Sequence, residues 1–171
     1  EKHAIDFVAQ WLEKRSVAAV LVEPILGRGG CVVPPEGFLR QLSDRARASG
    51  ALLIVDEIWT GLGRTGTLVR SATSGAQADI ICFGKGLGGG LSLSACVAPS
   101  AIMSAWAQGG QVVHSSTHAG HPLSCATALA TLDTLDREQL VRRSREVGAR
   151  FVATLQRKLM HLETVTEIRG E

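Results

Sequence analysis

The stretches ALLIVDE (residues 51–57) and ADIICFGK (residues 78–85) decide the fold class of this chain. Each is a short apolar run that ends at an ionisable residue, Asp56 in the first and Lys85 in the second. Short apolar runs bounded by turn residues are typical of strands buried in a parallel sheet. A third run, residues 17–22, has the same form and ends at a glutamate. These runs predict three buried strands.

Helical patterns separate and surround the predicted strands. Residues 34–50 open with two prolines, carry apolar residues on one face and stop at a glycine. The alternation of strand, helix and strand predicts an α/β fold with a mostly parallel sheet and flanking helices. A fourth apolar run, residues 91–98, follows too soon for a helical crossover, so we expect it to be antiparallel. Further helices are expected at residues 4–14, 100–107, 122–135 and 138–160.

The bulk composition is that of an ordinary globular domain. The 171 residues are 45% hydrophobic and 20% charged, with a formal net charge of +2 and no tyrosine. This balance favours neither nucleic acid nor a membrane as partner, and no apolar run approaches the roughly 20 residues that span a bilayer. The four cysteines are far apart, without a C-x-x-C pair, which favours a reduced, cytoplasmic setting.

Three ionisable residues directly follow the predicted strands, namely Glu23, Asp56 and Lys85. The carboxyl ends of parallel strands meet at one edge of the sheet, where open α/β sheets bind their ligands. We therefore expect these three side chains to converge on a candidate active site.

Lys85 stands between an apolar strand and the glycine-rich run GLGGG (residues 86–90). It could simply cap the strand at the surface. Among residues without bulk, however, a lysine can be partly desolvated while it leaves room for a bound ring. Desolvation favours the free amine that Schiff-base formation requires. The context favours this second interpretation.

Asp56 could likewise cap the turn after its strand, but a carboxylate here also suits a pyridine ring as ligand. It would pair with the protonated ring nitrogen, so that the ring withdraws electrons from the substrate. At about 4 Å and an effective dielectric constant of ~20, such a pair is worth up to roughly 4 kcal/mol. That energy is sufficient to keep the ring protonated at neutral pH.

Three histidines, His114, His118 and His121, lie close together in the sequence. Zinc sites usually have four ligands at fixed spacing, and the only cysteine nearby is Cys125. We therefore predict that this segment forms an ordered turn that leads into a helix and binds no metal.

Four motifs in order resemble the successive signatures of the class III aminotransferases, the ornithine and ω-amino group of fold type I enzymes. They are VEPILGRGGCVVPPEGFL (22–39), LLIVDEIWTGLGRTG (52–66), ADIICFGKGLGGGLSLSA (78–95) and THAGHPLSCATALATLD (117–133). The resemblance implies a pyridoxal 5'-phosphate (PLP) enzyme that moves an amino group from an amino acid or amine to a keto acid. The implied mechanism is ping-pong, through a Schiff base on Lys85.

The resemblance also implies roles for the residues around Asp56. Asp56 would bind the pyridine nitrogen, and Ile58 would pack against one face of the ring. Glu57 and Trp59 belong to the same cofactor-binding run. Trp59 departs from the family, since many members carry Gln there to bind the ring hydroxyl, and an indole can donate a hydrogen bond but not accept one.

Residues farther from Asp56 also match positions with roles in the family. Thr117 corresponds to a threonine that reaches the cofactor phosphate of the neighbouring subunit, which implies a homodimer. Ser116 would lie near the substrate, and Glu23 would lie behind the cofactor. Arg28 occupies a position where several members carry glutamate, so we expect a different donor preference, such as an acidic substrate group.

Two alternative functions remain open from the sequence. The run ALLIVDE resembles the Walker B strand of a P-loop NTPase, but no G-x-x-x-x-G-K-[ST] loop is present. A catalytically inactive relative that acts as a scaffold is the other alternative, against which the presence of both Lys85 and Asp56 argues.

The ends of the chain look cut, with a strand-like segment beginning at residues 165–168. By the resemblance, residues 1–161 would be part of the PLP-binding large domain and residues 162–171 the start of a small C-terminal domain. The family's phosphate loop and its substrate-binding arginine would lie outside this sequence. We therefore expect residues 1–171 alone to bind the cofactor poorly and to be inactive.

Overall fold

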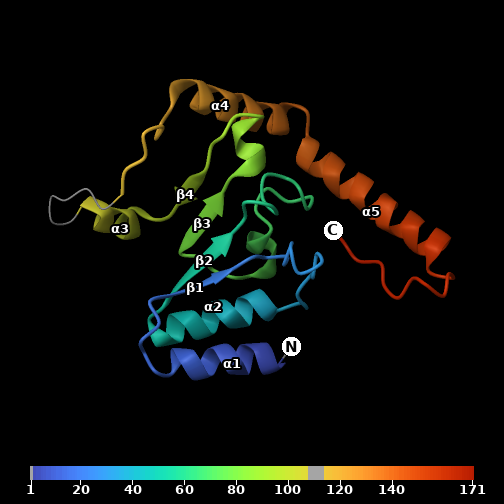
Figure 1. Cartoon of the computed structure of the whole chain (residues 1–171), viewed down its shortest axis with the longest axis horizontal. Helices are drawn as coiled ribbons and strands as arrows, with labels where there is room; N and C mark the ends of the chain where they lie inside the picture. Colours follow the sequence, from blue (N-terminus) through green and yellow to red (C-terminus); the bar gives the residue numbers. More distant parts are fainter. Residues whose placement is uncertain (1, 108–113) are drawn as a thin grey trace.

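The computed structural model describes residues 2–107 and 114–171 (Figure 1). Its strands are β1 (Ala19–Val22), β2 (Leu52–Asp56), β3 (Ile80–Phe83) and β4 (Ala95–Val97). Its α-helices are α1 (Lys2–Leu12), α2 (Phe38–Ser49), α3 (Ser100–Met103), α4 (Pro122–Arg137) and α5 (Leu140–Leu159). Three short 3-10 helices are η1 (Ser71–Ser74), η2 (Lys85–Gly88) and η3 (Ser104–Ala107).

The four strands form one sheet in the order β1-β2-β3-β4 (Figure 1). β2 pairs in parallel with both β1 and β3, whereas β4 is antiparallel to β3. The predicted α/β fold with a mostly parallel sheet is confirmed, and so is the antiparallel fourth strand. The register places Val22 opposite Val55 and Asp56 opposite Cys82, so the parallel strands end at a common edge.

The core lies between the sheet and the helix pair α1 and α2, which run side by side below the sheet in Figure 1. Leu53 and Val55 of β2 are 1% and 0% exposed and pack with Ile5 of α1 and Leu42 of α2. Burying side chains of this size stabilises the fold by about 1.5–3 kcal/mol each. This layer fixes β2, whose last residue is Asp56.

The predicted end of α2 at Gly50 is also present. Gly50 has a φ of 80°, and its N–H is directed at the carbonyls of Ala46 and Arg47. Glycine adopts this left-handed conformation without the steric cost that a Cβ would bring. The chain therefore turns at once into β2 with Ala51 already buried.

Two expected strands differ from the prediction. The run 91–98 contributes only Ala95–Val97, because η2 and turns with positive φ at Gly89 and Gly90 occupy the chain before it. Residues 165–168 pair with no strand in the described part of the chain. A segment with an apolar pattern forms a strand only where a neighbouring strand can hydrogen-bond to it. This segment instead turns back toward the loop after β1. There, Nε of Arg169 donates a hydrogen bond to the carbonyl of Gly30 at 2.9 Å.

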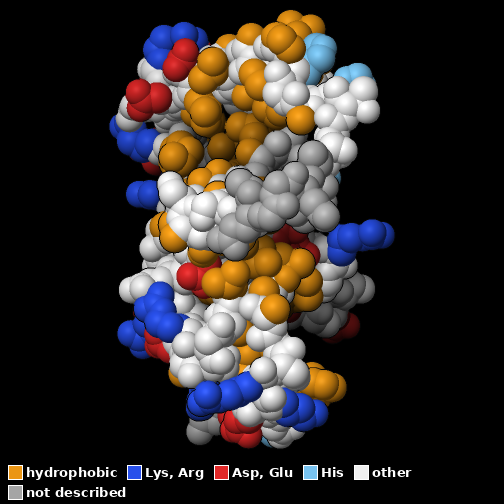
Figure 2. Space-filling model, turned by 90° about the vertical axis from the view of Figure 1, so that its left-hand side faces the viewer, with side chains coloured by type: hydrophobic (Ala, Val, Ile, Leu, Met, Phe, Trp, Pro, Cys, Tyr) orange, Lys and Arg blue, Asp and Glu red, His pale blue; other side chains and the backbone are white. Residues whose placement is uncertain are grey.

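The C-terminal helices leave much apolar surface uncovered. α4 lies against η2, but α5 buries no residue, and Phe151 on its predicted apolar face is 61% exposed. Figure 2, which faces the side of the molecule away from α5, shows that hydrophobic side chains are exposed there as well. Apolar surface of this kind usually marks a contact with further protein. Within residues 2–107 and 114–171, no helix is both long and apolar enough to cross a membrane.

Candidate active site

The carboxyl edge of the parallel strands carries the ionisable residues that the sequence singles out. Asp56 is the last residue of β2, Glu23 directly follows β1, and Lys85 lies one residue beyond β3 and Gly84. Glu23 and Asp56 line a common, mostly apolar pocket of about 640 Å³. Lys85 lines two neighbouring pockets of about 550 and 840 Å³. The edge thus carries all three residues, but Glu23 and Asp56 line one pocket and Lys85 lines two others.

Asp56 is held by the turn that follows it. Its Oδ1 accepts a hydrogen bond from the backbone N–H of Ile58 at 2.9 Å, the pattern by which aspartate commonly stabilises a turn. Within the described residues no protein group bonds Oδ2. The half-buried carboxylate therefore keeps one oxygen for a ligand.

Lys85 has an unusual backbone. Its φ is 45°, a left-handed conformation that costs a residue with a Cβ about 1–3 kcal/mol. Such strain in a residue at a sheet edge is common in functional sites. The side chain is exposed in this chain, contrary to the expected partial desolvation, because only glycines and small residues flank it. Any desolvation of Lys85 must come from groups outside the described chain.

The glycine run after Lys85 serves a packing purpose. A Cβ on Gly89 would lie 2.5 Å from Oγ1 of Thr131 in α4, and φ of Gly89 is 57°. Leu87 and Gly88 are buried in the same contact between η2 and α4. The absence of side chains at Gly89 thus lets α4 approach the backbone just beyond Lys85.

Ile58 and Trp59 continue the site on the other side of the strand ends. A Cβ on Gly84 would lie 3.2 Å from Cγ2 of Ile58, so Ile58 packs directly over the residue before Lys85. Ile58, Trp59 and Lys85 line the pocket of about 550 Å³ together. The indole of Trp59 is 38% exposed, and its ring edge passes 3.0 Å from the place of a Cβ on Gly27.

Glu23 is committed to the loop after β1. Its Oε2 accepts a hydrogen bond from the N–H of Gly27 at 3.1 Å. Gly27 also lies against the indole of Trp59. The carboxylate of Glu23 therefore holds in place the loop that the indole contacts. Arg28, the next residue, is exposed.

Glu57 directs its side chain to the opposite face from Asp56, since successive side chains of an extended chain alternate between faces. It is 1% exposed, and Oε1 accepts hydrogen bonds from N–H and Oγ of Ser71 at 2.7 and 2.8 Å. Its Oε2 accepts a third, from Oγ1 of Thr60 at 2.6 Å. These contacts hold the turn between β2 and η1 in place. The sequence did not predict that Ser71 and Thr60 bond to Glu57. Only the alternation of side chains after Asp56 could have indicated that Glu57 is buried.

Ser116 and Thr117 lie in the loop before α4. Ser116 lines the pocket of about 840 Å³ together with Lys85, His114 and His118. Thr117 is exposed and does not line that pocket. The structure therefore brings Ser116 toward Lys85 within one chain, but not Thr117.

Three histidines, at positions 114, 118 and 121, lie in the segment that leads into α4. In the part of the chain that the structure describes, no three His, Cys, Asp or Glu residues are grouped to hold a metal ion. The rings of His118 and His121 meet edge to face with centroids 6.1 Å apart. His114 and His118 line the pocket of Lys85 and so form part of its rim.

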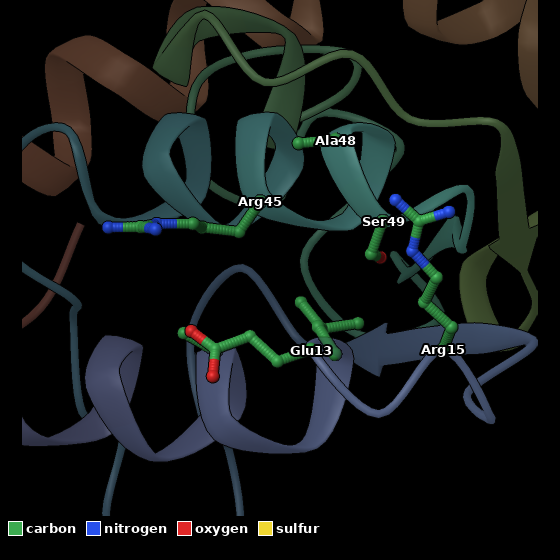
Figure 3. A pocket seen from close by; sticks show the side chains of 7 residues that line it. Glu13, Arg15, Arg45, Ala48 and Ser49 are labelled. Carbon is green, nitrogen blue, oxygen red and sulfur yellow. The ribbon is translucent and has the colours of Figure 1, made fainter.

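A separate pocket of about 280 Å³ lies between α1 and α2 (Figure 3). Glu13, Arg45 and Ser49 extend into the space between the two helices. Both helices end there, at the amino ends of β1 and β2. This pocket is thus at the opposite end of the sheet from Asp56 and does not belong to the candidate site.

The chain is similar to known aminotransferases. The family model described as "Aminotransferase class-III" matches residues 3–171 of the chain. The chain is 39% identical over 153 residues to the acetylornithine aminotransferase of Methanothermobacter thermautotrophicus, and 42% identical over 156 residues to the ornithine aminotransferase of Brevibacillus brevis. These matches cover 90% and 91% of the chain but only 38% of each relative.

Solved structures give the same result. The ornithine aminotransferase of Toxoplasma gondii, with partial occupancy of PLP at its active site, superposes with a TM-score of 0.92. It is 38% identical, and the match covers 98% of the chain and 39% of that protein. A P-loop NTPase is not favoured by any of these findings. The chain, which spans about two-fifths of the length of these relatives, belongs to the class-III aminotransferase family.

Proposed function

We propose that the protein containing this chain is a PLP-dependent aminotransferase that transfers an amino group from an amino acid or amine to a keto acid. The observation that carries the proposal is the position of Lys85 and Asp56 at the same carboxyl edge of the parallel strands. The relatives named above, which are aminotransferases, support it. Because both residues are present, we favour an active enzyme over an inactive scaffold.

The residues at the edge fit the chemistry of PLP. Lys85 supplies an exposed amine for the aldehyde, and Asp56 keeps Oδ2 available for a ring N–H. Ile58 supplies an apolar surface for one face of the ring. Glu57 has both oxygens engaged by Ser71 and Thr60, so its contribution is to hold the turn that presents Asp56.

The mechanism assigns a separate task to each ionisable residue. When bound, PLP supplies an electron-withdrawing ring and an aldehyde that takes up amino groups. Asp56 keeps the proton on the ring nitrogen and so maintains that withdrawal. Lys85 would hold the cofactor through Nζ, and that amine, when free, would accept a proton from the substrate carbon and deliver it on the same face.

A homodimer would complete the site. We propose that Thr117 binds the cofactor phosphate of the neighbouring subunit and that Ser116 lies near the substrate. The exposure of Thr117, and the apolar surface that the chain leaves uncovered, support an interface here. Glu23 would act behind the cofactor by supporting the loop under Trp59.

The domain division and the cellular setting are also proposals. Residues 1–161 would form part of the large domain and residues 162–171 the start of the small domain, which the end of α5 at Leu159 supports. The four cysteines are free in the described structure, which supports a reduced, cytoplasmic setting.

Arg28 is the residue that we expect to influence donor choice. It is exposed in the loop that also carries Gly27, beside the indole of Trp59. A positive charge there favours a substrate with an additional acidic group. Steady-state kinetics of Arg28→Glu with acidic and neutral donors test this expectation. An unchanged preference between the two kinds of donor would contradict it.

The proposed function is tested by amino transfer from a panel of donors to a keto acid, with the full-length protein. Replacing Lys85 with alanine removes both the anchor and the proton-transfer group. We expect kcat to fall by about 10²–10⁴-fold or more. Lys158→Ala, an exposed lysine in α5, is the matched control and should retain activity. Full activity in Lys85→Ala would contradict the proposal.

A further inference from the structure

Two of the four cysteines face each other across the sheet. Cys82 of β3 lies directly opposite Cys96 of β4 in the antiparallel register. Residues directly opposite one another in a sheet place their side chains on the same face. Both cysteines are free thiols in this structure.

The hydrogen-bond pattern shows which kind of cross-strand pair this is. The carbonyl of Cys82 accepts its bond from the N–H of Glu57, beyond β2, at 2.9 Å. The backbone polar groups of one strand residue point to the same side, so those of Cys82 face away from β4. Cys82 and Cys96 are therefore a non-hydrogen-bonded pair, in which Cα atoms are about 4.5 Å apart and side chains are closest. Disulfides require Cα separations of about 4.4–6.8 Å.

We propose that Cys82 and Cys96 are a redox-active pair that closes into a cross-strand disulfide when the protein meets a peroxide. The pair lies in the same row as Asp56, which is opposite Cys82 on β2. The segment between the two cysteines carries Lys85 and the glycine run. The bond would thus tie the two strands at the base of the loop that holds the proposed cofactor lysine.

The two thiols have different parts in the reaction. Cys96 is exposed on β4, the edge strand of the described sheet, and meets the oxidant first. Burial raises the pKa of the Cys82 thiol, with further contributions from Cys96 and Asp56, and this half-buried thiol reacts second.

The chemistry balances with hydrogen peroxide as the oxidant. The thiolate of Cys96 attacks one peroxide oxygen, the O–O bond breaks, and the hydroxide that leaves is protonated to water. The thiolate of Cys82 then attacks the sulfur of the resulting sulfenic acid, forms the S–S bond and displaces a second hydroxide, which also becomes water. Two thiols are oxidised by two electrons, and one peroxide is reduced to two waters.

Peptide mapping of the full-length protein tests the proposal, after stoichiometric hydrogen peroxide and blocking of free thiols. Trypsin separates the cysteines, because Cys82 lies in peptide 71–85 and Cys96 in peptide 86–137. The second peptide also contains Cys125, so the mapping uses the Cys125→Ser variant. We expect the two peptides to be linked, and separated again by dithiothreitol. Cys96 oxidised to sulfinic acid with no linked peptide would overturn the proposal.

Matched variants keep the result interpretable. Cys96→Ala should abolish the link, whereas Cys31→Ser should leave it intact. The oxidised protein should also melt higher than the reduced protein, by on the order of 5 °C, because a short loop is closed. Cys96→Ala should show no such rise on peroxide treatment. An equal rise in Cys96→Ala would also count against the pair. None of these measurements depends on amino transfer. They therefore test the disulfide independently of the proposed function.

Discussion

The turn after β2 and the loop before α4 carry different parts of the proposed site, and they are held very differently. In the turn, residues 56–71, the buried Glu57 gathers hydrogen bonds from Thr60 and Ser71, and Asp56 bonds the N–H of Ile58. In the loop, residues 114–121, Ser116 and Thr117 are exposed. A chain that lacks much of its relatives' length can thus build the turn by itself. Within the described residues, the side chains of Ser116 and Thr117 make no comparable hydrogen bonds.

This difference has a physical basis. The turn follows a strand whose Leu53 and Val55 are buried under α2, so its position is fixed by the core. The loop comes after the short strand β4 and the short helices α3 and η3. No residue of α3 is buried. We infer that the turn is preorganised for a cofactor, whereas the loop acquires its shape in the assembled protein.

Among changes in these two regions, the largest effect should follow from one in the preorganised turn. Asp56→Asn keeps the shape and the hydrogen bond to Ile58 but removes the charge. Loss of up to roughly 4 kcal/mol of pairing with a ring N–H corresponds to a fall of about 10³-fold in kcat. Steady-state kinetics measure it, with the exposed Asp133→Asn as the control. Equal activity in the two variants would show that Asp56 has no electrostatic role.

A smaller effect, on stability, should follow from Glu57→Ala. The change leaves the N–H and hydroxyl of Ser71 and the hydroxyl of Thr60 without their buried acceptor. We expect the free energy of unfolding to fall by about 3 kcal/mol. Urea unfolding of the full-length protein measures it, and the exposed Glu36→Ala is the control. If both variants lose the same amount, the turn is not held by Glu57.

The smallest effect concerns the loop. Thr117→Ala should weaken PLP binding about tenfold, the equivalent of one hydrogen bond to a charged group. Equilibrium titration of the apoprotein measures this, and the neighbouring Ser115→Ala should bind normally.

Mixed dimers show in which subunit Thr117 acts. Subunits with Thr117→Ala are combined with subunits that carry Lys85→Ala. The intact Lys85 then has a partner with an intact Thr117, and normal affinity should return at that site. If mixing leaves the affinity weakened, Thr117 acts within its own chain.

The sequence predicted the parallel strands and their common edge because apolar runs and turn residues are local signals. The end of α2 at Gly50 and the antiparallel direction of β4 followed from the same reasoning. The inward position of Glu57 and its bonds to Ser71 depend on a contact between distant residues, which no local pattern encodes. The exposure of Lys85 was not foreseen, since the number of covering groups depends on packing alone. For the same reason, residues 165–168 looked like a strand but have no partner within the described chain.

The central claim, that Lys85 carries the cofactor, is tested most directly by reduction of the full-length protein with borohydride in the presence of PLP, followed by tryptic mapping. A modified Lys85 blocks trypsin, so the label should appear in a single peptide that covers residues 71–137. The label should be absent from Lys85→Ala. A labelled peptide elsewhere, with 71–85 and 86–137 recovered unmodified, would contradict the claim.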